Sequence, residues 1–303
     1  MDELLKTYLF KDDVKDEGII PYLSHRDFKG LLCEERSFRN SVGLRVAYFF
    51  YVYQNYRTDK LILFLHGVGP GHKAYIREIE CLCKRGYRVL TLDYSGCGKS
   101  EGDGFSSLFS PTRDVLELLN NLQPEEEITV VGHSLGGFTG LNVMNLTEIK
   151  KAVIISGFLS LSWYMSALGR KEELTVYERN AMPNLCDTDN VRYLHETEDD
   201  ILLIHSKDDP IVPFDVSIGY ILREIDNPHL SFHIETSRKH NPNYTDGALR
   251  YMNAVFSEYQ RLVSDGTLRT YEQKKAFMSD KSAMEMTHQD EKIMQEIVNL
   301  IEK

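Results

Sequence analysis

The sequence predicts an α/β fold built on a doubly wound, mostly parallel sheet with a small helical cap. Short apolar runs of buried-strand length recur along the chain, and segments with helical spacing separate them. Glycine-rich or polar turns follow several of these runs. Strands that alternate with helices in this way form a parallel sheet covered by helices, and functional loops then gather at the carboxyl ends of the strands.

The elements are expected in the following order. Residues 1–40 are charged and aromatic with little periodicity, which indicates an N-terminal segment packed on the core. Leu44–Tyr53 alternates apolar and aromatic residues as an antiparallel edge strand does. Residues 74–85 and 111–122 have the spacing of helices packed on a sheet. The remaining strands are predicted at Leu61–Leu65, Arg88–Leu92, Ile128–Val131, Ala152–Ser156, Ile201–His205 and Leu230–Thr236.

These elements divide the chain into a core at 41–157 and 200–265, a cap at 158–199 and a C-terminal helical extension at 266–303. The cap segment is longer than a simple crossover requires. Its large apolar side chains, which include the only tryptophan, suit an acyl or aryl group above the site. The alternative is an ordinary helical connection that buries the same side chains in the core.

The end of the chain carries an apolar helical stripe among charges, at Ile293, Ile297, Leu300 and Ile301. Such a stripe buries itself either on its own domain or against another subunit. We expect docking on its own domain, while an oligomer formed through the extension remains the alternative.

The segment Gly132–Gly136 places a serine between two glycines, directly between an apolar strand and a helical segment. This pattern predicts a nucleophile elbow, in which Ser134 takes left-handed backbone angles and exposes its hydroxyl. The backbone N–H of Leu135, at the start of the helix, can then donate to a developing oxyanion. A glycine-rich turn with a capping serine is the alternative interpretation of this segment.

Two further strands also end in turns. His66–His72 follows the first buried strand, and its glycines let the backbone N–H of Val68 approach a substrate carbonyl as a second oxyanion donor. Gly98–Ser100 imitates the end of a phosphate-binding loop. That match is rejected, because Asp93 occupies the position where a phosphate-binding loop requires its first glycine.

The downstream strands supply an acid and a base. Asp208 and Asp209 follow the strand that ends at His205, and a carboxylate there can orient an imidazole. His240 lies on a polar loop just past the last strand, so its ring is the candidate base. His233 lies within that strand and is expected to face solvent or the core.

With these residues in place, the chain resembles the α/β-hydrolase family of serine hydrolases over about residues 45–262, and most closely its monoacylglycerol-lipase-like and serine-aminopeptidase-like branch. The order serine, acid, histidine is the order of that family. The resemblance implies the α/β-hydrolase fold, and it assigns the acid to Asp209 with Asp208 as the competitor. Two positions depart from the family pattern, since Ser206 and Lys239 stand where glycines are usual.

The resemblance implies a serine hydrolase that cleaves an ester of a small acyl or aryl substrate through an acyl-enzyme. A thioesterase, an acyltransferase or a small-substrate peptidase would use the same residues, and a non-catalytic binding protein on this scaffold is the alternative from another class. The expected site consists of Ser134, Asp209 and His240 as catalytic residues, Val68 and Leu135 as oxyanion donors, and His66, Gly67, Phe158, Trp163 and Tyr164 around the substrate.

Composition narrows the partners. The formal net charge is −11 and the pI is about 5.4, which argues against nucleic acid and anionic membranes. No run approaches the roughly 18 apolar residues of a membrane span, and the first residues do not read as a targeting segment. We therefore expect a cytoplasmic enzyme without membrane insertion, metal or organic cofactor, whose partner is a small acyl substrate.

Overall fold

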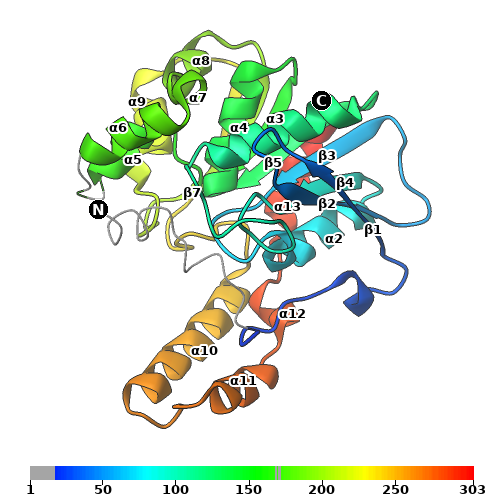
Figure 1. Ribbon diagram of the computed structural model, residues 1–303, viewed down its shortest axis with the longest axis vertical. Coiled ribbons are helices and arrows are strands. Elements are labelled where there is room, and N and C mark those ends of the chain that lie inside the picture. Colours follow the sequence, from blue (N-terminus) through cyan, green and yellow to red (C-terminus); the bar gives the residue numbers. More distant parts are fainter. Residues whose placement is uncertain (1–17, 168, 170–171) are drawn as a thin grey trace.

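The computed structural model describes residues 18–303 except 168, 170 and 171. Residues 1–17 of the predicted N-terminal segment, and Leu168 of the predicted cap, lie outside the described residues. The described chain forms an eight-stranded sheet in the order β1-β2-β4-β3-β5-β6-β7-β8 (Figure 1). The strands are β1 Leu32–Arg39, β2 Arg45–Val52, β3 Lys60–Leu65, β4 Arg88–Leu92, β5 Glu127–His133, β6 Lys151–Ile155, β7 Asp200–Ser206 and β8 Leu230–Glu235.

The six strands from β4 to β8 in this order are parallel, whereas β2 pairs antiparallel with both β1 and β4. This arrangement confirms the predicted fold class and every strand predicted from the sequence. The edge position predicted for Leu44–Tyr53 is wrong, because β1 pairs along the whole of β2 and is itself the edge. β1 lies within the segment expected only to pack on the core, and its mostly exposed residues lack the apolar alternation that signals a strand.

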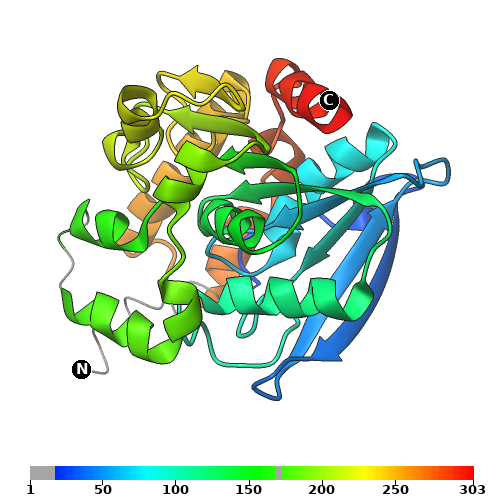
Figure 2. The same cartoon turned by 90° about the horizontal axis from the view of Figure 1, so that it is seen from above.

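Helices cover both faces of the sheet, as Figure 2 shows from above. α2 and α13 pack on the face that carries Ile62 and Phe64 of β3, while α3, α4 and α9 pack on the face that carries Leu61 and Leu63. None of the described helices is both long and apolar enough to cross a bilayer. The helices are α2 Ile76–Lys84, α3 Ser110–Leu122, α4 Leu135–Leu146, α5 Leu161–Ala167, α6 Glu172–Ala181, α7 Pro183–Cys186, α8 Asn190–Glu196, α9 Ile218–Glu224, α10 Asp246–Ser264, α11 Tyr271–Ser279, α12 Ala283–Met286 and α13 Glu291–Glu302.

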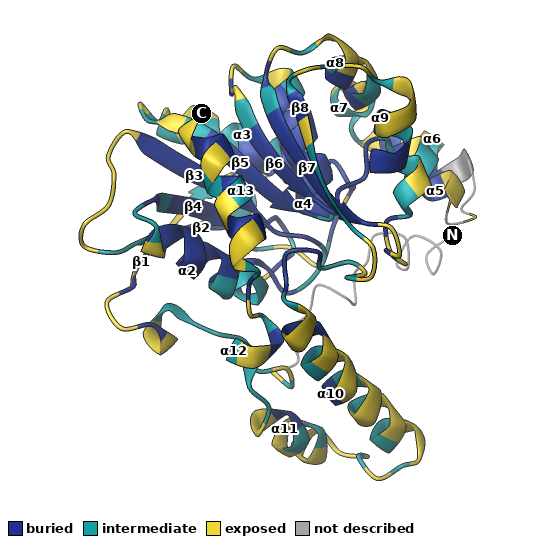
Figure 3. Cartoon of the chain, turned by 180° about the vertical axis from the view of Figure 1, so that it is seen from behind, coloured by how far each residue is buried: buried dark blue, intermediate teal, exposed yellow. Residues whose placement is uncertain are grey.

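The C-terminal part separates into a helical projection and a docked helix. α10, α11 and α12 extend away from the sheet and pack mainly on one another (Figure 1). The chain then returns, and α13 buries Ile293, Ile297, Leu300 and Ile301 against β6 and β7, with the strands buried behind it (Figure 3). The predicted stripe is therefore docked on its own domain. The apolar face of α13 completes the core on this side of the sheet, so α13 is part of the same folded unit as the sheet.

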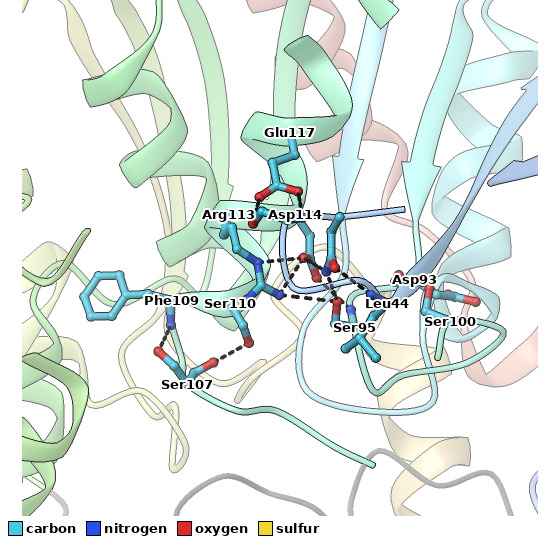
Figure 4. A network of polar contacts seen from close by, with 12 residues as sticks. Leu44, Asp93, Ser95, Ser100, Ser107, Phe109, Ser110, Arg113, Asp114 and Glu117 are labelled. Carbon is cyan, nitrogen blue, oxygen red and sulfur yellow. Dashed lines mark hydrogen bonds and ion pairs between the residues drawn. The ribbon is translucent and has the colours of Figure 1, made fainter. Parts of the chain in front are cut away.

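A polar network joins the loop after β4 to α3 and to the β1–β2 turn (Figure 4). Asp114 of α3 is fully buried and accepts hydrogen bonds from the N–H of Ser95 at 2.7 Å and from Nδ2 of Asn40 at 3.0 Å. Arg113 pairs with the same carboxylate at 2.8 Å. A buried carboxylate is stable when charged donors and N–H groups surround it in this way. The network fixes the loop that begins at Asp93 against α3.

Candidate active site

The predicted catalytic residues and oxyanion donors lie at the carboxyl ends of β3, β5, β7 and β8, and the predicted cap residues Phe158, Trp163 and Tyr164 follow β6. A cavity of about 390 Å³ opens between the loops at these strand ends and the cap. Both Ser134 and His240 line it, although they are far apart in the sequence. The lining consists of Val68, Tyr75, Leu108, His133, Ser134, Leu135, Phe158, Tyr164, Ile211, His240 and Asn241.

Ser134 occupies a sharp turn between β5 and α4. Its backbone angles are φ 56° and ψ −119°, a combination that costs energy for a residue with a side chain. The turn closes so tightly that a Cβ atom on Gly132 would lie 2.2 Å from the carbonyl oxygen of Gly136, and one on Gly136 would lie 2.0 Å from that of Leu65. Glycine is required at both positions, which confirms the turn geometry predicted from the sequence.

Asp209 and His240 meet at the edge of the sheet. Oδ2 of Asp209 lies 2.8 Å from Nδ1 of His240, and Oδ1 accepts hydrogen bonds from the N–H groups of Ile211 at 2.8 Å and Val212 at 3.0 Å. Burial alone would raise the pKa of Asp209, but the His240 ring and these N–H groups outweigh burial and lower it. The carboxylate is therefore ionised and fixed beside the imidazole. Because Nδ1 of His240 bonds Asp209, Nε2 is the ring nitrogen left to interact with other groups.

The loop after β3, which carries the predicted oxyanion donor Val68, is held in place by the buried ring of His66. This ring is fully buried, and burial lowers its pKa to about 4, so it is neutral at pH 7. Its Nε2 accepts from the N–H of Tyr94 at 3.4 Å, and its Nδ1–H donates to the carbonyl oxygen of Gly67 at 2.7 Å. In a trans peptide the N–H points opposite to the C=O. The bond from His66 therefore turns the N–H of Val68 away from the buried ring.

Comparisons with known proteins bear on the fold described above. A family model described as the alpha/beta hydrolase fold matches residues 60–171. The probable esterase PIR7A of Oryza sativa subsp. indica is 31% identical over 121 residues, which cover 39% of this chain and 44% of that protein. The chain belongs to the α/β-hydrolase superfamily. The lysophosphatidylserine lipase ABHD12 of Xenopus tropicalis is 24% identical to this α/β-hydrolase over 233 residues, which cover 63% of this chain and 55% of the lipase. The match thus spans less than two thirds of either relative.

Solved structures agree with the α/β-hydrolase fold. The esterase Est1E of Butyrivibrio proteoclasticus superposes with a TM-score of 0.58 at 17% identity, over 74% of this chain and 97% of Est1E. At this level of identity the likeness concerns the fold alone. The chemistry of this α/β-hydrolase therefore has to be argued from its own residues.

Ser206 and Lys239, which stand where the family usually has glycines, are both held by hydrogen bonds to Asp208. Lys239 has φ 51°, so a lysine takes the left-handed angles that favour glycine. Oδ1 of Asp208 accepts the N–H of Lys239 at 2.9 Å and the hydroxyl of Ser206 at 2.6 Å. That hydroxyl also accepts the N–H of Arg238 at 3.0 Å. Asp208 therefore anchors the loop before His240, whereas Asp209 contacts the ring.

The structure brings only some of the predicted substrate-binding residues to the cavity. Phe158 and Tyr164 line it and stack on each other with ring centroids 4.3 Å apart. Trp163 lies outside this cavity and packs on Tyr220 with ring centroids 4.6 Å apart, because successive residues of a helix point in different directions. His66 and Gly67 also do not line the cavity, and the hydrogen bond between them holds the first residues of the loop after β3.

Several lining residues were not singled out from the sequence. Tyr75 lies at the end of the loop after β3, Leu108 in the loop before α3, Ile211 near Asp209 and Asn241 next to His240. The N–H of Leu108 is bound by the buried Glu178 of α6 at 2.9 Å, which ties the cap to this wall. No local pattern distinguishes these residues in the sequence, because only the tertiary fold turns them toward Ser134.

Proposed function

We propose that this α/β-hydrolase is a serine hydrolase that cleaves ester bonds of small acyl or aryl substrates through an acyl-enzyme. The observation that carries the proposal is the convergence of three features on one cavity. A serine with left-handed backbone angles and the ring of His240 line that cavity, and the buried carboxylate of Asp209 is bonded to that ring. A nucleophile, a base and an orienting acid are the parts that activated-serine chemistry requires.

The first step is attack by Oγ of Ser134 on the ester carbonyl carbon. His240 accepts the serine proton at Nε2 as the new carbon–oxygen bond forms, and Asp209 holds the ring in the required tautomer and offsets its charge. The imidazolium then donates that proton to the leaving alkoxide as the ester bond breaks. Water attacks the acyl-enzyme by the reverse proton transfers, which releases the acid and regenerates Ser134.

The oxyanion of each tetrahedral intermediate is stabilised by the N–H groups of Val68 and Leu135. Leu135 is the first residue of α4, and the first N–H groups of a helix have no acceptor within it. Val68 lies on the cavity wall, and its peptide is oriented through Gly67 by His66. Two fixed donors aimed at the developing charge are the usual source of a large rate enhancement in acyl transfer.

The cavity favours a neutral ester with an apolar acyl group. Val68, Leu108, Leu135, Phe158 and Ile211 supply apolar walls, and none of the described lining residues is an aspartate, glutamate, lysine or arginine. A volume of about 390 Å³ suits a small ligand. The two relatives named above, an esterase and a lipase, support the same class of substrate.

The deciding experiment compares the wild-type protein with Ser134→Ala. The wild-type protein should react with a fluorophosphonate probe and hydrolyse p-nitrophenyl esters. The variant should lose both reactions, because a nucleophilic serine contributes several orders of magnitude in rate. Circular dichroism and thermal melting check that the variant is folded. Probe labelling or ester turnover that survives in folded Ser134→Ala would refute the assignment.

A further inference from the structure

The hydroxyl of Tyr75 lies between the oxyanion loop and the turn that carries Ser134. Its oxygen is 3.1 Å from the backbone nitrogen of Gly67 and 2.9 Å from Nδ1 of His133, the residue before Ser134. The space is tight, since a Cβ atom on Gly67 would lie 2.7 Å from this hydroxyl. Phe64 packs against the Tyr75 ring with centroids 5.5 Å apart and holds it in place.

The other nitrogen of His133 reaches the third loop of the site. Nε2 of His133 lies 2.8 Å from the backbone carbonyl oxygen of His240, and the two rings pack edge to face with centroids 4.8 Å apart. Only 6% of the surface of His133 is exposed. The loops bearing Val68, Ser134 and His240 are thus joined by one continuous chain of hydrogen bonds.

The direction of each bond in the chain is fixed by the groups at its ends. Burial lowers the pKa of His133 to about 3, so the ring is neutral and carries a single proton. The carbonyl of His240 can only accept, so that proton resides on Nε2. Nδ1 must then accept from the hydroxyl of Tyr75, and the oxygen of Tyr75 accepts from the N–H of Gly67. Every polar group along the chain is satisfied.

We propose that Tyr75 is a positioning residue that holds the oxyanion loop, the nucleophile turn and the base loop in register. This inference rests on the proposed ester hydrolysis. Both backbone groups of Gly67 are hydrogen-bonded, its N–H to Tyr75 and its C=O to His66. The next backbone N–H along the chain is that of Val68, the proposed oxyanion donor. His133 adjoins Ser134 in the chain, so its bond to His240 sets the distance between nucleophile and base. Displacements of about 1 Å in such groups can cost on the order of a hundredfold in rate.

Tyr75→Phe tests the role, because it removes the hydroxyl and keeps the ring. Tyr53→Phe is the matched control, since the Tyr53 hydroxyl bonds Glu80 of α2, the helix that begins after Tyr75, at 3.1 Å and Tyr53 does not line the cavity. We expect kcat/KM for p-nitrophenyl butyrate to fall about ten- to a hundredfold in Tyr75→Phe. The loss should lie in kcat, and the rate of fluorophosphonate labelling should fall in parallel, since both reactions use the same three loops. Tyr53→Phe should stay within twofold of wild type.

A direct measurement of the His133 ring tests the chain without relying on activity. In protein labelled with ¹⁵N-histidine, the His133 ring should remain the neutral Nε2–H tautomer from pH 5 to 8. A doubly protonated ring or an Nδ1–H tautomer would overturn the inference. So would a Tyr75→Phe variant within twofold of wild type, provided that Ser134→Ala is inactive. If the wild-type protein neither hydrolyses esters nor reacts with the probe, the proposed function fails, and the tautomer still reports on the hydrogen bonds.

Discussion

Two regions of the molecule are held together in different ways: the cap, and the site edge formed by the loops after β3, β5, β7 and β8. At the edge, the loops after β3, β5, β7 and β8 are fixed by buried polar contacts, such as His66 to Gly67 and Asp209 to two backbone N–H groups. The cap combines stacked rings with a few polar ties. The ring centroid of Phe158 lies 4.4 Å from that of Phe138 of α4 and 4.3 Å from that of Tyr164, while the buried side chains of Glu178 and Asn190 bond the N–H of Leu108 and the side chain of Asn142.

This difference separates two tasks. Hydrogen bonds are directional, so polar contacts can hold reacting groups within the narrow tolerance that chemistry requires. Apolar contacts depend mainly on buried area and shape, so a cap built from them can vary to suit different acyl groups while the edge stays constant. We therefore expect changes at the edge to alter the rate for all substrates and changes in the cap to alter the choice among them.

The largest effect after loss of the nucleophile is expected at Asp209. Asp209→Asn should lower kcat about 10⁴-fold, because an amide in this place favours the wrong tautomer of His240. Asp208→Asn is the matched control, since it changes the neighbouring carboxylate that anchors the loop through Lys239. That variant should lose far less activity. The opposite ranking of the two variants in a p-nitrophenyl ester assay would mean that Asp208 is the acid.

A buried carboxylic acid outside these loops, Glu78 of α2, should make the stability of the protein depend on pH. This side chain is buried beneath the segment that follows His240, and burial raises its pKa to about 7, although Tyr244, Gln289 and Asn243 counteract part of that rise. The folded protein therefore binds a proton more tightly than the unfolded chain, whose glutamate has the ordinary value of 4.5. This contribution is fully present below pH 4.5 and is lost as the pH rises through 7.

The matched variant is Glu78→Gln, which cannot ionise. Relative to wild type, it should gain stability between pH 4.5 and 8, by about 3 kcal/mol, since each pKa unit corresponds to about 1.4 kcal/mol. Urea denaturation of both proteins at pH 5 and pH 8 measures the difference. A difference that stays constant between these two values of pH would show that Glu78 is not a carboxylic acid held neutral by burial.

The same contrast explains how far the sequence could predict the molecule. The elbow was predictable because Gly132 and Gly136 are required by backbone contacts that any such turn makes. Asp209 and His240 follow strand ends, so their meeting depends only on strand order. Trp163 was misplaced, because the face that a short helix presents to a cavity depends on packing with distant residues such as Tyr220. Tyr75 was missed for the same reason.

The smallest effect is expected in the cap, where Phe158 lines the cavity and Trp163 does not. If apolar cap contacts bind the acyl group, Phe158→Ala should lower kcat/KM more for octanoyl and cinnamoyl esters than for acetyl esters. The difference should be about 1 to 3 kcal/mol in discrimination.

Trp163→Ala is the matched control, because it removes a large ring of the same cap that packs on Tyr220. This variant should lower the melting temperature while affecting all esters by a similar factor. Measuring kcat/KM for acetyl, butyryl, octanoyl and cinnamoyl esters on both variants decides between these roles. A uniform drop in Phe158→Ala would mean that this ring serves the core alone, and selective loss in Trp163→Ala would mean that long substrates reach beyond the cavity.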